Sequence, residues 1–384
     1  PRNVIREVSV MSRPVLRTEL CDLLNIEYPI MLAGMGVWGM GTPPELVAAV
    51  SDAGGLGVLG GSALSPEEVR RRIQRVRQLT DKPFGVDLLL PASLAAASTT
   101  RTGVREELRR NHPEHVAFMH GLLERFELTP VPVDNDIVNS DVYAEAQIQV
   151  VLEEEVPVFA AGLGDPARIV PRAREQGMKV IGLAGTVRNA ERNRDAGVDI
   201  VVCQGTEGGG HTGPVATLPL VAQAVEAVAP VPVVAAGGIV GGAGIAAALT
   251  LGAIGVWLGT AFLVAEECGL PNVVKDDIID GKATDFRISQ AWTGKTLRAK
   301  RSVVTDAWAE AGLAPLPSPH QRVLMEDFLS AAIDAGRWDL YMNAAGQGAG
   351  MLAERRPAAD IMADLVSGAV LALSETPQRV EFSA

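Results

Sequence analysis

Cysteine is scarce in this chain of 384 residues, which contains only Cys21, Cys203 and Cys268, far apart in the sequence. An odd, scattered set argues against a disulfide scaffold or a Cys-x-x-Cys zinc site and favours a reducing compartment. Long basic runs are missing too, and 34 Lys+Arg against 46 Asp+Glu give a net charge of −12. This charge argues against a nucleic-acid partner and leaves small molecules as the expected partners.

Long apolar runs and several catalytic patterns are also missing. Charges at Arg2, Arg6 and Arg13 interrupt the first residues, so neither a signal peptide nor a membrane span is expected there. We expect a cytoplasmic protein, and leave a homo-oligomer open. No GxSxG, HExxH or P-loop pattern occurs, which weakens hydrolase and kinase interpretations. With 40 glycines and 47% hydrophobic residues, the composition is that of a globular chain.

Short β-branched and apolar runs alternate with segments of helical period along most of the chain. All but one of the intervals between these runs fit a single strand-plus-helix unit. Ser65-Pro66-Glu67-Glu68 shows one helix start clearly, with an N-cap followed by proline at the first helical position. The pattern predicts an α/β fold. We expect a (β/α)8 TIM barrel over residues 15–265, in preference to an open doubly wound sheet. The eight expected strands centre near Met31, Val58, Val86, Val158, Ile181, Val201, Val234 and Val256.

The one long interval indicates an insertion at about 91–140, after the third strand, with a polar helical part at 104–126. Because it follows a barrel strand, it would lie at the face where active sites form. A substrate lid is one interpretation, and a surface excursion or an oligomer contact is the other. Residues 266–350 are expected to form a smaller second domain that includes a broken, charged stretch, and residues 351–384 a C-terminal helix returning to the barrel. Helices are expected at 321–335 and 358–373.

The first glycine cluster, Gly34 to Gly39, matches the GxGxxG pattern of dinucleotide-binding folds. That function needs a helix that opens within the glycines and an acidic residue at the end of the second strand. Thr42-Pro43-Pro44 delays the helix, and the second strand ends in Leu59-Gly60-Gly61 without a carboxylate. We therefore expect this loop to lie with its backbone against a flat ring.

Two further glycine loops close the seventh and eighth strands. Gly237 and Gly238 follow one, and Gly259 and Thr260 follow the other. In (β/α)8 enzymes these two loops commonly bind phosphate through backbone amides and a helix N-terminus. Taken singly each would be an ordinary turn. Together they predict a site for a phosphorylated substrate or for the phosphate of flavin mononucleotide, FMN.

His211 is the single histidine placed on a loop after a strand, and Gly209 and Gly210 leave it sterically free. Its imidazole suits proton transfer near neutral pH or stabilisation of an anion, and a role in bracing the loop is the alternative. Gln204 and Asp87, both at strand ends, could hydrogen-bond a polar ring or ribityl chain, or satisfy loop backbone. We expect solvated helix residues, and no metal ligands, at His112, His115 and His120.

These segments together resemble the nitronate monooxygenase family, formerly called 2-nitropropane dioxygenases, and the related flavin-dependent enoyl-acyl-carrier-protein reductases. The segments that carry the resemblance are Pro29 to Gly36, Gly54 to Gly57, Pro83 to Leu88, Gln204 to Gly213, the two phosphate loops and Ala345 to Gly350. Two positions depart from the family: Asp87 stands where Asn is usual, and Gly34 where the family usually has proline.

The resemblance implies non-covalently bound FMN and a role for each matching residue. Ala33, Gly34 and Met35 would lie beside the isoalloxazine and Gln204 beside the ring or ribityl chain. His211 would act as the acid/base or orient an anionic substrate. The phosphate would be held by Gly237, Gly238, Gly259 and Thr260. The cofactor would be covered from the C-terminal part of the chain by Gln347 and Gly348.

The leading hypothesis is FMN-dependent oxidation of alkyl nitronates by O2 to carbonyl compounds and nitrite. The alternative is an FMN-dependent reductase that uses NAD(P)H on enoyl thioesters or quinones. A third interpretation, a barrel that binds a sugar phosphate without a flavin, follows from the phosphate loops alone.

Overall fold

A closed barrel of eight parallel strands forms the centre of the computed structural model, which describes residues 14–36, 39–62, 64–90, 99–131, 133 and 140–379. The strand order is β1-β9-β8-β6-β5-β4-β3-β2, and a bridge from Met31 to Leu56 joins the two ends. Each expected strand centre lies inside one of these strands, so the (β/α)8 prediction is confirmed. They are β1 (Ile30–Leu32), β2 (Gly57–Gly60), β3 (Phe84–Leu90), β4 (Val158–Gly164), β5 (Lys179–Ala184), β6 (Ile200–Gln204), β8 (Val233–Ala236) and β9 (Val256–Leu258).

Side chains alternate between the barrel interior and the surrounding helices, as the period of two in a strand requires. In β1, Met31 points into the inner cluster, whereas Ile30 and Leu32 belong to the outer one. Helix α1 (Glu19–Leu24) closes the barrel at the amino ends of the strands, where Leu20 joins the inner cluster. The opposite end, at the carboxyl ends of the strands, is left open for a site.

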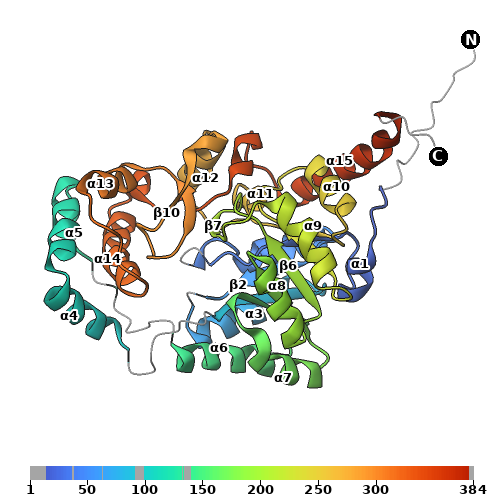
Figure 1. Cartoon of the computed structure of the whole chain (residues 1–384), viewed down its shortest axis with the longest axis horizontal. Helices are drawn as coiled ribbons and strands as arrows, with labels where there is room; N and C mark the ends of the chain where they lie inside the picture. The colour runs from blue at the N-terminus through green and yellow to red at the C-terminus, as the bar shows by residue number, and fades with distance from the viewer. Residues whose placement is uncertain are drawn as a thin grey trace, which may run out of the picture.

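Helices cover the outside of the barrel (Figure 1). The Ser65 hydroxyl accepts a hydrogen bond from the Glu68 N–H at 3.2 Å, which confirms the expected start of α3. The Asp165-Pro166 pair likewise starts a short 3₁₀ turn before the next helix. The outer helices are α2 (Pro44–Asp52), α3 (Pro66–Leu79), α6 (Asp141–Glu153), α7 (Val170–Glu175), α8 (Val187–Ala196), α9 (Thr217–Ala227), α10 (Gly242–Thr250), α11 (Thr260–Leu263) and α15 (Ala358–Arg379).

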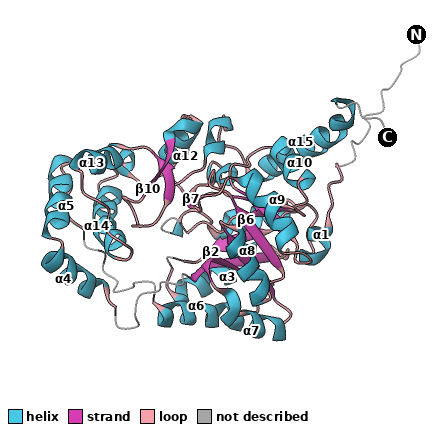
Figure 2. Cartoon of the chain, viewed as in Figure 1, coloured by secondary structure: helices cyan, strands magenta, loops and turns pink. Residues whose placement is uncertain are grey.

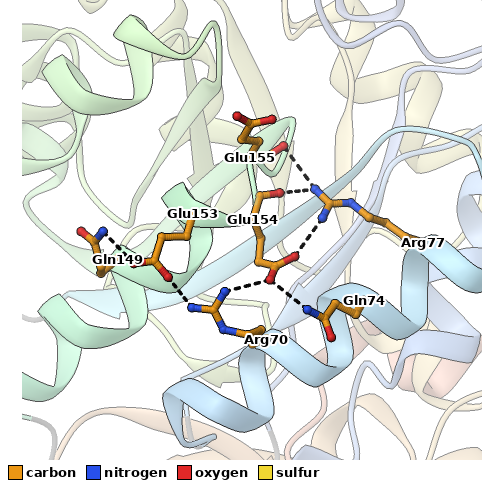
Figure 3. A network of polar contacts seen from close by, with 7 residues as sticks. All are labelled: Arg70, Gln74, Arg77, Gln149, Glu153, Glu154 and Glu155. Carbon is orange, nitrogen blue, oxygen red and sulfur yellow. Dashed lines mark hydrogen bonds and ion pairs between the residues drawn. The ribbon is translucent and has the colours of Figure 1, made fainter.

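A polar network fixes α6, where the chain returns from the insertion, to α3 (Figure 3). Glu154 is at its centre, because its carboxylate accepts from Arg70 at 2.9 Å, from Arg77 at 2.9 Å and from Gln74 at 3.1 Å. Arg70 also pairs with Glu153. The insertion therefore ends on a helix held firmly against the barrel.

The remaining elements form a second group beside the barrel, in which α4, α5, α13 and α14 lie together (Figures 1 and 2). The helical part expected at 104–126 is present as two helices, which divide at His112 and Pro113. The helices expected at 321–335 and 358–373 are present as α14 and α15. The group contains α4 (Arg101–Asn111), α5 (Pro113–Arg125), α12 (Asn272–Ile279), α13 (Val303–Ala311), α14 (His320–Asp334), β10 (Phe286–Ser289) and β11 (Leu297–Lys300).

The charged stretch at 272–301 contains two strands that the sequence patterns do not predict. Antiparallel β10 and β11 form a three-stranded sheet with β7 (Gly210–His211), which belongs to the loop after β6. The division of the chain into domains stays a prediction, and residues 91–98, 132 and 134–139 of the insertion lie outside the described part. Among the described helices, we find none long and apolar enough to span a lipid bilayer.

Candidate functional site

A cavity of about 850 Å³ opens at the carboxyl ends of the barrel strands. This volume lies within the range of small-molecule and cofactor sites. All but two of the site residues expected from the sequence line it, namely Ala33, Gly34, Met35, Asp87, Gln204, Gly209, Gly210, His211, Gly237, Gly238, Gly259 and Thr260.

The two exceptions, Gln347 and Gly348, lie behind the cavity wall in a 3₁₀ turn. The Gln347 N–H donates to the Glu207 carbonyl at 2.9 Å. A Cβ on Gly348 would come within 2.9 Å of the Gly238 carbonyl oxygen. Both residues therefore support loops that line the cavity, and the cover expected from the C-terminal part is indirect.

The loop after β8 has the geometry of an anion cradle. Gly237 and Gly238 have φ of +103° and +73°, and a Cβ on Gly237 would lie 2.8 Å from the Gly205 carbonyl oxygen. Only glycine adopts this path without strain. The N–H groups of Gly238 and Ile239 donate no hydrogen bond to any described residue. These donors, followed by helix α10, suit a negatively charged group.

Hydrogen bonds of the Thr42 hydroxyl fix the loop after β1. This hydroxyl contacts the Met35 N–H at 3.2 Å and accepts from the Gly60 N–H at 2.8 Å. Helix α2 begins only at Pro44, beyond the glycines, so the loop lacks the helix start of a dinucleotide-binding turn. At Gly34 a Cβ would lie 2.3 Å from that of Asp87, so no larger residue fits beside Asp87.

Asp87 points into the cavity because its neighbours Val86 and Leu88 pack outward against the helices. Its carboxylate accepts one hydrogen bond, from the Gly162 N–H at 3.0 Å. Burial raises the pKa of this carboxyl well above its ordinary value, and the Gly162 hydrogen bond offsets only part of that rise. The cavity therefore favours the neutral acid at this position.

His211 is held by a strand from the C-terminal part of the chain. Its backbone pairs with Leu297 of β11, and its Nε2 lies 3.1 Å from the Thr293 hydroxyl. The Gln204 side chain donates to the His211 carbonyl at 2.9 Å. Burial above all, and then the charges of Arg322 and Lys295, lower the pKa of His211 to about 4. The imidazole is thus neutral at pH 7, which differs from the expected titration near neutral pH.

Three side chains of one wall could not be found from local sequence patterns. Thr293 and Lys295 come from the loop between β10 and β11, and Arg322 comes from α14. The sequence patterns indicated only a charged stretch around Thr293 and Lys295 and a helix at 321–335 that contains Arg322. The places of Thr293 and Lys295 depend on the pairing of β11 with β7, and the place of Arg322 depends on its ion pair with Glu326. No local periodicity predicts either contact.

The histidines of the insertion differ from expectation at one position. His115 is buried, and its Nε2 lies 2.9 Å from the Ala314 carbonyl oxygen. His112, Glu114 and His115 do bring ligand atoms within 4.8 Å of one another. The burial of His115 fixes α5 to the segment that precedes α14, so it is not the solvated side chain that its spacing suggested.

Comparison with known proteins agrees with this geometry. The family model described as nitronate monooxygenase matches residues 17–368. A provisionally named monooxygenase of Mycobacterium tuberculosis, Rv1533, is 39% identical and covers 81% of this chain and 84% of its own. A protein of Staphylococcus aureus named "Probable nitronate monooxygenase" is 33% identical, and the match covers 91% of this chain and 97% of that protein.

Two solved structures are similar over nearly the whole chain. Nitroalkane oxidase from Streptomyces ansochromogenes is 32% identical with a TM-score of 0.79, covering 92% of this chain and 99% of its own. FabK from Thermotoga maritima is 30% identical with a TM-score of 0.75, covering 95% and 100%. The chain therefore belongs to the nitronate monooxygenase family of flavin-dependent oxidoreductases.

Proposed function

We propose that the chain binds FMN and oxidises alkyl nitronates with O2 to carbonyl compounds and nitrite. The observation that carries this proposal is the cavity itself, which brings the glycine loops after β8 and β9 and the loop of His211 to one place. The nitroalkane oxidase neighbour and the family membership support the same class of substrate.

The described residues fit a phosphate-bearing flavin. Gly237 and Gly238 form a cradle that a Cβ would fill, and unpartnered backbone N–H groups follow it. Gly259 and Thr260 face the same cavity from β9. A phosphate bound here would be neutralised by backbone dipoles, so no cluster of basic side chains is needed.

The ring of the flavin would lie toward the loop of Ala33, Gly34 and Met35, whose backbone Thr42 fixes. When bound, the flavin supplies the redox chemistry of the reaction. Gln204 holds the backbone of His211 through its side-chain amide. His211, neutral and hydrogen-bonded to Thr293, could offer or accept a hydrogen bond to a substrate bound in the cavity.

Aerobic nitrite release from ethyl or propyl nitronate tests the proposal. The purified protein should be yellow, should release FMN on heat denaturation, and should produce nitrite faster than the same concentration of free FMN. A protein that carries bound flavin but does not turn over nitronates would refute the function. Release of a different flavin would refute the cofactor.

The alternative is reduction of enoyl thioesters or quinones by NAD(P)H. The cavity volume of about 850 Å³ favours this alternative. The volume lies toward the upper end of the range for small-molecule sites, so the cavity could admit a second large ligand beside the flavin. FabK is structurally similar over 95% of this chain. Rapid anaerobic bleaching of the flavin by NADH or NADPH would favour this alternative, and slow bleaching would weaken it.

A further inference from the structure

Two cationic side chains lie on the wall that the C-terminal part of the chain gives to the cavity. Lys295, between β10 and β11, and Arg322, on α14, both line it. Lys295 is partly buried, and within the described ranges its ammonium group forms no ion pair or hydrogen bond. A cation that is partly removed from water without a partner is suited to an anionic ligand.

Arg322 is held in place by two linked ion pairs, the second of which involves a residue of the insertion. Its Nε donates to Glu326 at 2.7 Å, and Glu326 also pairs with Arg101 of α4. The carboxylate of Glu326 is therefore shared between two arginines. The insertion thereby positions a side chain of the cavity, although none of its described residues lines the cavity.

Among the described residues of the lining, the other titratable groups do not cancel these charges. Burial favours the neutral form of Asp87, and His211 is neutral at pH 7. Arg192 adds a further cation at an exposed place on the lining. The described lining is thus positive within a chain whose net charge is −12, and such a local field attracts small anions.

We infer that Lys295 and Arg322 form an anion-binding subsite that holds the charged group of a small organic monoanion. The two cations supply the charge, and neutral His211 supplies only a hydrogen bond. Burial and the nearby charge of Arg322 lower the pKa of Lys295, as expected for two cations facing the same space. Under the proposed function the anion would be the nitronate, but the subsite requires no oxidation.

Calorimetric titration of the protein as purified with sodium propionate tests the subsite, with propionamide as the uncharged counterpart. The parent should bind propionate more tightly than propionamide. Lys295→Met should weaken propionate binding about tenfold to a hundredfold, the effect expected for the loss of a charge-assisted hydrogen bond, and should leave propionamide unchanged. Lys295→Arg should restore most of the affinity.

Lys82→Met is the matched control, because Lys82 is exposed in the turn before β3 and does not line the cavity. It should bind propionate like the parent. Arg322→Met gives a second test if Lys295→Met fails to fold. The inference is wrong if the parent does not prefer propionate to propionamide, or if these cavity variants bind propionate as the parent does. Propionate binding through Lys295 in a protein that releases no nitrite from nitronates would refute the proposed function and support the subsite.

Discussion

Arg101→Met removes one partner of the buried ion pair that joins the insertion to α14. The side chains of Arg101 and Glu326 are only 5% and 6% exposed. Removing one partner of a buried pair costs about 3–5 kcal/mol, because the other charge is left uncompensated. Since Arg322 still donates to Glu326 at 2.7 Å, we expect the lower end, about 3 kcal/mol.

Thermal unfolding followed by tryptophan fluorescence measures this loss. With an unfolding entropy of about 2.1 cal/mol/K per residue, a loss of about 3 kcal/mol lowers the Tm of the whole chain by about 4 °C. Arg105→Met is the control, because its pair with Asp327 is 21% and 31% exposed and should contribute about 1 kcal/mol or less. In a Glu326→Gln background, Arg101→Met should lower the Tm less than it does in the parent, because the ion pair is already lost.

Equal Tm values for Arg101→Met and Arg105→Met would refute the assignment of stability to the buried pair. An undiminished effect of Arg101→Met in the Glu326→Gln background would do the same. The second result would place the contribution of Arg101 in contacts other than its ion pair.

Three further predictions concern the cavity. Burial raises the pKa of Asp87, so the folded protein loses stability where Asp87 is ionised only in the unfolded chain. Asp87→Asn should therefore leave the free energy of unfolding unchanged below pH 3.8 and raise it increasingly above pH 3.8, until the folded-state pKa is passed. Urea unfolding at pH 4, 6 and 8 should show this trend. Because the pKa of His211 is lowered to about 4, the parent should lose stability as the pH falls from 6.5 to 4; a loss of the same size in His211→Asn would contradict this. Gly237→Ala should lose flavin on gel filtration, whereas Gly177→Ala, with φ +70° and open space around it, should retain it; equal flavin content would exclude a cradle at Gly237.

The barrel could be predicted from the sequence because its signals are local. Each strand is a short apolar run that ends at a turn, and helix starts such as Ser65-Pro66 are readable from neighbouring residues. Gln204 was found for the same reason, since a residue at the carboxyl end of a barrel strand faces the open end. Asp87 was expected at a strand end but lies in the middle of β3, and it lines the cavity because its side chain points away from the helices. The helical part of the insertion was also read from local period.

The second wall of the cavity could not be predicted, because it depends on contacts between distant segments. Lys295 reaches the cavity only because Leu297 pairs with His211. Arg322 lies on a helix that was expected, but the direction of its side chain depends on Glu326 and Arg101. The low pKa of His211 follows from the same packing, so its charge state could not be read from the flanking glycines.

The three-stranded sheet that joins β11 to β7 has a consequence for the order in which the site is completed. During synthesis all eight barrel strands precede residue 259, so the glycine loops exist before the partner of His211 has been made. Thr293, Lys295 and Arg322 come later. A chain shortened after the barrel would therefore contain the glycines of the cradle but neither the turn of Gln347 and Gly348 nor the strand that holds His211. The site is completed only when the last third of the chain folds back on the first two.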